Sequence, residues 1–434
     1  MKYAIITPTY KPHFKYIKKY LESYEKYVVD AEEIELVFTI SASEEKAFSK
    51  ITKKYAGRIQ FRTLFIEDIL KQYDICTAPT KLLTKYKKFT FQTLKKYYTM
   101  LYVDADYSLV LDSETMWVRE TRMVELFENY YKHPFITYSN MDRRRAVAAL
   151  CKHIVHNVNY IFNKAKKPAL IEPESTNEIN NIVEPKIFNI WCLENFVWYY
   201  DKRILHDMFD ELGSPIEMAN CVRRIKNKKV ADAGIFEINL YQTYIVAHND
   251  KYQYKLIDVD ESLEQCLKAA DREQFLSSFF ALYNGRCGLL ERVLPFLTPS
   301  NYKALGLFFK ENHFNIIRGD LDRFKKSELE LAENFLSIVE PHILAASQHH
   351  LFSVNATPKN RFNVLFHGNK YYFRIKKHWK IWATPIIIIS TPIKILLIYI
   401  AKVLIWIIQP LAILLNVFKL AIYMLKKTSI IFKN

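Results

Sequence analysis

The stretch Leu101–Val110 (LYVDADYSLV) decides the fold that the sequence predicts. Apolar and β-branched residues run through it, as in a buried strand, and two carboxylates interrupt its middle. Asp104 and Asp106 stand at positions i and i+2, which face the same side of a regular strand. Ionised carboxylates are rarely buried without partners. We therefore expect the pair at the end of the strand, beside a cleft where a cation can neutralise it.

This Asp-x-Asp pair offers hard oxygen ligands, which suit Mg²⁺ or Mn²⁺. Such ions take one or two protein carboxylates and leave other positions to water and a substrate diphosphate. A surface turn with two solvated aspartates would give the same pattern. A helical stretch with Lys95 and Lys96 precedes the aspartates and the apolar run Tyr107 to Leu111 follows them, which favours a metal and diphosphate site.

The pattern Leu-Tyr-Val-Asp-Ala-Asp-Tyr-x-Leu-Val resembles the metal-binding strand of GT-A glycosyltransferases, which are nucleotide-sugar enzymes with a single Rossmann-like domain. The resemblance covers residues 1–260. It implies that Asp106 is catalytic and that Asp104 and Asp106 hold Mn²⁺ or Mg²⁺ against the diphosphate of a donor, most simply a UDP-sugar.

Predicted strands and helices alternate before this stretch, which favours an α/β fold with a Rossmann-like sheet flanked by helices. The strands are 2–8, 34–41 and 59–64, and the helices are 14–27 and 44–55. The loop after the first strand lies at the carboxyl edge of such a sheet, where open α/β folds bind ligands. By resemblance, Tyr10 stacks on uracil and Thr7 or Thr9 bonds to it. An ordinary strand-to-helix turn is the alternative.

Residues 81–98 predict a basic, aromatic-rich helix that carries Gln92 and Lys95 toward the head of the aspartate strand. A Gln-x-x-Lys helix before an Asp-x-Asp strand resembles a bacterial group of GT-A-like proteins and, more loosely, the glycogenin-type transferases. The resemblance implies donor binding by Gln92 and Lys95. A solvated basic face is the alternative. The arginines at 143–145 could grip phosphate, or could belong to a solvated loop.

Glu237 is the second candidate catalytic residue. The segment 232–244 predicts a helix with Glu237 in its first turn, where the helix dipole keeps a carboxylate anionic. Its Phe-Glu-x-x-Leu-Tyr spacing is similar to the Ser-Glu-Tyr-x-x-Tyr segment of the same bacterial group, although Phe236 replaces a small residue. Glu237 is then a general base or an acceptor-binding group. His248, after the strand-like Tyr244–Ala247, is the candidate third metal ligand, and a purely structural histidine is the alternative.

Composition limits the class of protein. The 434 residues are 50% hydrophobic and 15% aromatic, which excludes a disordered chain. A formal net charge of +16 implies a polyanionic partner: nucleic acid, an anionic membrane or phosphorylated ligands. Six scattered cysteines without a C-x-x-C pair argue against a zinc site and for a reducing compartment. No signal peptide is evident, so we expect the catalytic part in the cytoplasm.

The C-terminal third predicts two further regions. Residues 261–370 form a mainly helical extension. From residue 371 a basic-aromatic belt leads into an almost wholly apolar tail, whose polar residues share one sector of a helix. Lys402, Gln409 and Asn416 interrupt the apolar runs, so we expect helices in the membrane plane rather than spanning ones. A partner-binding helix and a spanning tail are the alternatives.

Together these observations predict a metal-dependent glycosyltransferase bound to the cytoplasmic face of the inner (plasma) membrane through its tail. Its partners are a nucleotide-sugar donor, a lipid-linked or glycan acceptor such as lipopolysaccharide or capsule, and the anionic inner leaflet, without nucleic acid. A sugar nucleotidyltransferase and a non-catalytic membrane-bound glycan-binding protein are the alternatives.

Overall fold

A computed structural model describes residues 1–75, 77–141, 149–165, 188–192, 198–264, 266–269, 271–272, 298–318 and 334–345. All of them belong to one compact unit, Met1–Ala356. The predicted belt and tail at 371–434 and the arginines at 143–145 lie outside the described residues. Within the described ranges, no helix combines the length and the apolar character needed to cross a bilayer.

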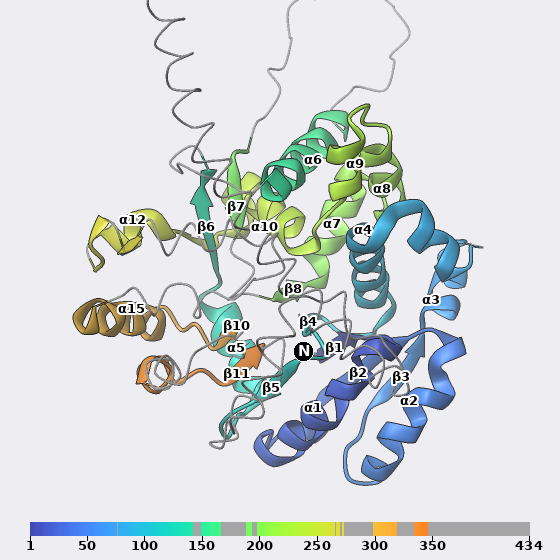
Figure 1. Ribbon diagram of the computed structural model, residues 1–434, viewed down its shortest axis with the longest axis horizontal. Coiled ribbons are helices and arrows are strands. Elements are labelled where there is room, and N and C mark those ends of the chain that lie inside the picture. The colour runs from blue at the N-terminus through green and yellow to red at the C-terminus, as the bar shows by residue number, and fades with distance from the viewer. Residues whose placement is uncertain are drawn as a thin grey trace, which may run out of the picture. The chain divides into compact units, whose positions relative to one another are not determined.

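A five-stranded sheet in the order β3-β2-β1-β4-β8 carries the fold (Figure 1). Its strands are β1 (Tyr3–Pro8), β2 (Ile34–Ile40), β3 (Arg62–Phe65), β4 (Tyr107–Val110) and β8 (Tyr199–Asp201). The first four are parallel, and β8 runs antiparallel to β4 at the edge. The predicted α/β class is thus confirmed, with a mixed sheet.

Helices cover both faces of this sheet: α1 (Phe14–Tyr27), α2 (Glu45–Thr52), α3 (Ile66–Gln72) and α4 (Pro79–Tyr102). Neighbouring residues of β2 show the two faces, because the Phe38 ring packs on Tyr20 of α1 and the Thr39 hydroxyl bonds to Thr99 of α4. The chain leaves β1 toward β2 and returns from β3 to β4. The strand order therefore reverses between β1 and β4, and the crevice at their carboxyl ends is where such sheets bind ligands.

The stretch Leu101–Val110 is not a single strand. Helix α4 continues to Tyr102, residues 103–106 turn, and β4 begins at Tyr107. Asp104 and Asp106 therefore precede the strand and lie at the amino edge of the sheet. The prediction that they end a strand is wrong, because a short apolar run such as Leu101 to Val103 fits the end of a buried helix as well as the start of a strand.

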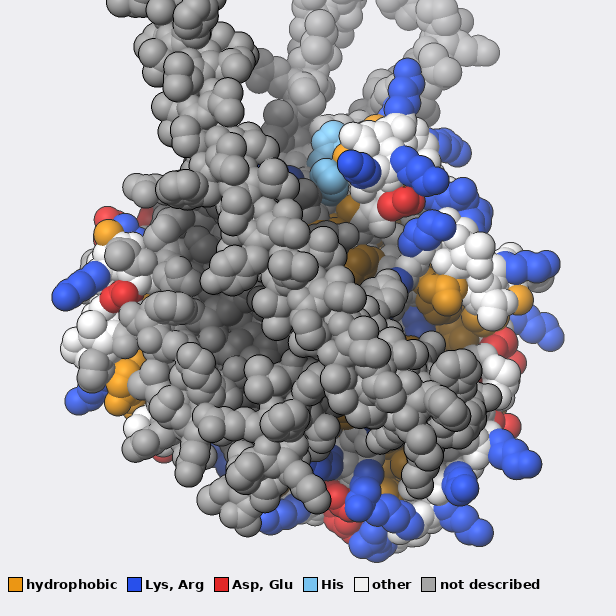
Figure 2. All heavy atoms as spheres, in the orientation of Figure 1, with side chains coloured by type: hydrophobic (Ala, Val, Ile, Leu, Met, Phe, Trp, Pro, Cys, Tyr) orange, Lys and Arg blue, Asp and Glu red, His pale blue; other side chains and the backbone are white. Residues whose placement is uncertain are grey.

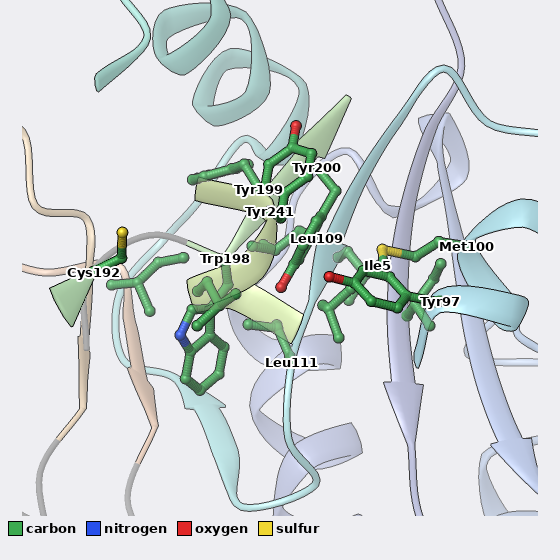
Figure 3. Packing of buried hydrophobic residues seen from close by; sticks show 14 of the residues in the cluster. Ile5, Tyr97, Met100, Leu109, Leu111, Cys192, Trp198, Tyr199, Tyr200 and Tyr241 are labelled. Atoms are coloured by element: carbon green, nitrogen blue, oxygen red, sulfur yellow. The ribbon is translucent and has the colours of Figure 1, made fainter. Parts of the chain in front are cut away.

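Aromatic side chains fill the core around β4 (Figure 3). Leu109 and Leu111 pack in a cluster with Tyr97 of α4, Tyr199 and Tyr200 of β8, and Tyr241 of α10 (Glu237–Ala247). Trp191 and Trp198 are only 1% and 6% exposed. They belong to the core, which is the commoner fate of such residues.

Two smaller three-stranded sheets complete the described strands. One joins β10 (Ile316–Arg318), β11 (Ile343–Ala345) and β5 (Thr115–Trp117), and the other joins β7 (Ile190–Cys192), β6 (Phe135–Asn140) and β9 (Lys255–Asp258). Strands β10 and β11 lie in the region predicted to be mainly helical. Because β11 pairs with β5, segments from both sides of the predicted boundary at residue 260 share one sheet.

The remaining described helices lie around the sheets (Figure 1). They are α5 (Met123–Lys132), α6 (Ala149–Ala165), α7 (Lys202–Leu212), α8 (Pro215–Arg223), α9 (Lys228–Ala233), α11 (Asn249–Tyr252), α12 (Val259–Glu264) and α15 (Pro299–Glu311). Among them, α8 and α9 pack against α4 and α6. Residues 244–247, predicted as a strand, belong to helix α10 instead. Helix α10 begins at Glu237, as the sequence predicts.

Candidate active site

An Asp-x-Glu pair stands where β4 ends. The Leu111 amide donates to the Ile6 carbonyl at 2.9 Å, which carries the pairing with β1 one residue past Val110. Asp112, Ser113 and Glu114 follow at once. The Asp112 side chain is 36% exposed and that of Glu114 18%. Two carboxylates therefore reach the carboxyl edge of the sheet at the β1–β4 switch point, the position at which we expected Asp104 and Asp106.

Lys96 bridges this pair to Glu237. Its Nζ lies 3.5 Å from Asp112 Oδ1 and 2.5 Å from Glu237 Oε1. The Glu237 side chain is only 5% exposed, and its Oε2 accepts a hydrogen bond from Thr93 Oγ1 at 3.0 Å. Both carboxylate oxygens of Glu237 are thus engaged, and its buried charge is compensated by Lys96.

Helix α10 starts directly against α4, which places Glu237 beside Lys96. The Tyr97 hydroxyl donates to the Glu237 carbonyl at 2.7 Å, and Thr93 Oγ1 contacts the Ile235 carbonyl at 2.8 Å. Gly234 permits this approach, since its φ is +73° and any side chain there would collide with Thr90 of α4. Glycine at position 234 therefore allows α10 to begin close to α4, and this places Glu237 in the site.

The loop after β1 reaches the same carboxylates through His13. Its Nδ1 lies 3.0 Å from Glu114 Oε1, and the Tyr10 ring packs on the imidazole with centroids 4.4 Å apart. The predicted base-binding loop is therefore joined to the Asp-x-Glu pair. Tyr10 itself is half-buried.

Lys95 points toward the β1 loop instead. Its Nζ donates to the Thr9 carbonyl at 2.6 Å. Burial lowers the pKa of Lys95 to about 8, although the negative charges of Glu44 and Glu67 act to raise it. The Thr9 hydroxyl is buried and has no hydrogen-bond partner in the described structure.

We expect Lys95 to make the stability of the protein depend on pH between about 8 and 10.5. In this range the unfolded chain keeps the proton that the folded chain has lost, so the free energy of unfolding rises with pH. The contribution is at most about 1.4 kcal/mol per pH unit. Urea unfolding should show that the free energy of unfolding rises less from pH 8 to pH 10 for Lys95→Met than for the wild type.

The exposed Lys88 supplies the control for this measurement. The variant Lys88→Met should keep the wild-type dependence, because the Lys88 side chain is exposed and the change leaves Lys95 buried as before. If the free energy of unfolding of Lys95→Met depended on pH as that of the wild type does, Lys95 would not be the group responsible.

Several other predicted residues lie elsewhere or are already engaged. Thr7 is buried, and its hydroxyl bonds to Tyr20 OH at 2.7 Å, so it faces the core. Gln92 is half-buried one helical turn before Lys96, on the same face. His248 ends α10, about 16 Å along the helix from Glu237. Its Nε2 lies 3.0 Å from Glu211 Oε2, which makes it a structural histidine and not a ligand at this site.

Asp104 and Asp106 interact with the N-terminus of the chain. Lys2 Nζ lies 2.5 Å from Asp104 Oδ2, and this hydrogen bond lowers the pKa of Asp104. The Lys2 amide donates to Asp106 Oδ2 at 2.8 Å. The Asp104 side chain is 87% exposed. Both residues thus stabilise the turn into β4, at the edge opposite Asp112 and Glu114.

The chemistry of the donor set fits a divalent ion. In the described ranges no three His, Cys, Asp or Glu side chains gather closely enough to hold a metal by themselves. Asp112 and Glu114 offer two hard, partly exposed carboxylates at the carboxyl edge of the sheet, and Mg²⁺ commonly binds one or two carboxylates together with substrate phosphates. The arrangement therefore suits an ion that is shared with a diphosphate.

We did not predict Asp112, Glu114, Lys96 or His13 as a connected site. A pattern was available in the sequence: the apolar run Leu109-Val110-Leu111 leads directly into Asp112-Ser113-Glu114. It places the carboxylates after the strand, as a ligand site at the carboxyl edge requires. We assigned the metal site instead to the Asp-x-Asp pair eight residues earlier, which has the same spacing of carboxylates.

Comparisons with known proteins find distant structural likeness alone. No family model and no curated protein matches the chain. Mouse xyloside xylosyltransferase 1 is 11% identical, with a TM-score of 0.31 over 65% of this chain and 93% of that one. The glycosyltransferase GlyE of Streptococcus pneumoniae is 9% identical, with a TM-score of 0.28 over 61% of this chain and 48% of that one. The 4-diphosphocytidyl-2C-methyl-D-erythritol synthase of Anaerococcus prevotii is 10% identical, with a TM-score of 0.28 over 59% of this chain and 86% of that one.

Glycosyltransferases, the class that the sequence resembles, are therefore among the solved structures similar to this chain. TM-scores of this size carry no argument about activity. We base the functional assignment on the site itself.

Proposed function

We propose that the protein is a metal-dependent glycosyltransferase that moves a sugar from a nucleotide-sugar donor to a glycan or lipid-linked acceptor. One observation carries the proposal: Asp112 and Glu114 stand at the carboxyl edge of the sheet, at the β1–β4 switch point, with Lys96 between Asp112 and Glu237. Open α/β sheets bind nucleotides at such a point.

Asp112 and Glu114 would hold Mn²⁺ or Mg²⁺ in this site. When bound, the ion neutralises the charge that grows on the nucleoside diphosphate as the glycosidic bond breaks. The protein's own part is to present two carboxylates in fixed positions. His13 orients Glu114 through the contact at 3.0 Å. The same contact holds the β1 loop in position relative to Glu114.

Lys96 is suited to stabilise the leaving diphosphate. Its ammonium lies next to Asp112, and a compact positive charge there attracts phosphate oxygens. Glu237 holds Lys96 at this place through the contact at 2.5 Å. A general base must reach the hydroxyl of the acceptor, and the Glu237 side chain is only 5% exposed and is paired with Lys96. We therefore assign Glu237 to positioning Lys96 rather than to proton abstraction.

A thermal-shift screen of nucleotide sugars with and without Mn²⁺ tests the proposal. A donor at 100 times its dissociation constant stabilises the folded state by about 2.7 kcal/mol, which raises the melting temperature by several degrees. We expect a UDP-sugar to give this shift only with Mn²⁺, and Asp112→Asn to abolish it. A shift that is equal without metal, or unchanged in Asp112→Asn, would contradict the proposed site.

The products separate the two alternatives from this proposal. A sugar nucleotidyltransferase releases pyrophosphate, whereas a glycosyltransferase releases a nucleoside diphosphate. A glycan-binding protein without catalysis would release neither.

Membrane association through the tail remains a proposal that rests on composition. The basic-aromatic belt after residue 371, and the polar residues that would share one sector of the helices predicted there, support a position in the cytoplasmic leaflet. That position would bring a lipid-linked acceptor, such as a precursor of lipopolysaccharide or capsule, close to the enzyme.

A further inference from the structure

The first half of α4 and the segment between α8 and α9 are strongly basic. Lys81, Lys85, Lys87 and Lys88 are all exposed on α4, which contains no Asp or Glu. The run 223–229 adds two arginines and three lysines, all exposed. Within the described structure, no ion pair joins any of these nine side chains to a carboxylate. We call this surface the basic face.

The two parts of the basic face are joined through Tyr86. The Tyr86 hydroxyl donates to Asn220 Oδ1 of α8 at 2.7 Å. The guanidinium of Arg223 lies 5.7 Å from the centroid of the Tyr86 ring, and Lys85 Nζ lies 4.7 Å from it. Figure 2 shows Lys and Arg side chains gathered on the side of the molecule where Figure 1 places α4, α8 and α9. The charges therefore form one surface.

Two large apolar side chains are exposed among these lysines. Leu83 is 43% exposed and Phe89 is 36% exposed, and both belong to α4. Clustered lysines with exposed leucine and phenylalanine match the interface of an anionic bilayer, where cations meet headgroups and apolar side chains enter the acyl boundary. A phosphate backbone would use the cations and leave the apolar groups in water.

We propose that the basic face docks on the surface of an anionic phospholipid bilayer, with Leu83 and Phe89 entering the interface. This contact is distinct from the tail, since it belongs to the unit that carries the candidate active site. Lys88 and Lys96 are eight residues apart on α4, about 12 Å along the helix. Because Lys96 contacts Asp112, docking would hold the proposed site close to the lipid. The inference holds whether or not the site transfers a sugar.

Hydrogen exchange of the full chain tests where the membrane lies. We expect vesicles of phosphatidylcholine and phosphatidylglycerol to slow amide exchange at residues 224–227, which connect α8 to α9, and vesicles of phosphatidylcholine alone to leave it unchanged. Slowed exchange confined to the tail would overturn the proposal. Slowing of the same amides by duplex DNA, with none by vesicles, would assign the face to nucleic acid instead.

Charge reversal supplies the matched comparison, read out as vesicle binding and not as turnover. The triple variant K85E/K88E/K228E should bind the anionic vesicles at least about 100-fold more weakly, because loss of each positive charge alone costs about 5-fold and its reversal costs more. The control K46E/K50E/K53E changes three exposed lysines of another surface by the same total charge and should bind within about 3-fold of wild type. Equal losses in the two variants, or no loss in either, would overturn the proposal.

Discussion

Asp112→Asn is expected to lower the rate of sugar transfer about 100-fold or more at saturating donor and Mn²⁺. The substitution keeps the shape of the side chain and removes the charge that a divalent ion requires. Stabilisation of the leaving diphosphate by the ion is worth several kcal/mol, and each 1.4 kcal/mol is a factor of ten in rate. The measurement is release of nucleoside diphosphate from the donor that the thermal-shift screen identifies.

Asp106→Asn is the matched control for this experiment. It makes the same chemical change in the Asp-x-Asp pair at the opposite edge of the sheet, where Asp106 accepts a bond from the Lys2 amide. We expect turnover within about twofold of wild type, since the side chain contacts no part of the proposed site. The reverse result, with Asp106→Asn inactive and Asp112→Asn active, would restore the assignment made from the sequence.

Lys96→Met should destabilise the protein by about 3 to 5 kcal/mol, because it leaves the buried Glu237 carboxylate without its counter-ion. The Lys96 side chain is 17% exposed and that of Glu237 5%, so solvent replaces the lost contact poorly. Urea unfolding monitored by circular dichroism gives the free energy. Lys88→Met, at an exposed position on the same helix, should change it by less than about 0.5 kcal/mol.

A second substitution separates loss of the ion pair from loss of packing. Lys96→Met combined with Glu237→Gln removes both charges and should recover more than half of the lost stability. A double variant as unstable as the single one would show that Lys96 stabilises the fold through its packing. Neither variant should transfer sugar at the wild-type rate, since both lack the ammonium beside Asp112.

The sequence predicted the α/β sheet well because its strands are strongly marked. Each of β1 and β2 is a run of apolar residues closed by a turn, and α1 carries its buried Ile17, Leu21 and Tyr24 at helical spacing. Such patterns depend on local burial, which a single sequence shows. The position of Glu237 in the first turn of a helix was also predicted, and α10 begins at this residue.

The centre of the site was less predictable because it depends on where one helix ends. Leu101 and Tyr102 continue α4, so the strand begins only at Tyr107, after the Asp-x-Asp pair. The carboxylates at the carboxyl edge are then Asp112 and Glu114 instead of Asp104 and Asp106. The bridge from Lys96 to Glu237 joins positions 141 residues apart, and no local pattern predicts such a pair.

The pairing of β11 with β5 sets a limit for anyone who shortens this chain to obtain crystals. Strand β5 starts at Thr115, the residue after Glu114, and β11 pairs with it antiparallel through Ile343, Leu344 and Ala345. A truncation before Ile343 would remove the strand that restrains the peptide next to a proposed metal ligand. Expression boundaries should therefore fall beyond Ala345, even where the apolar tail is left out.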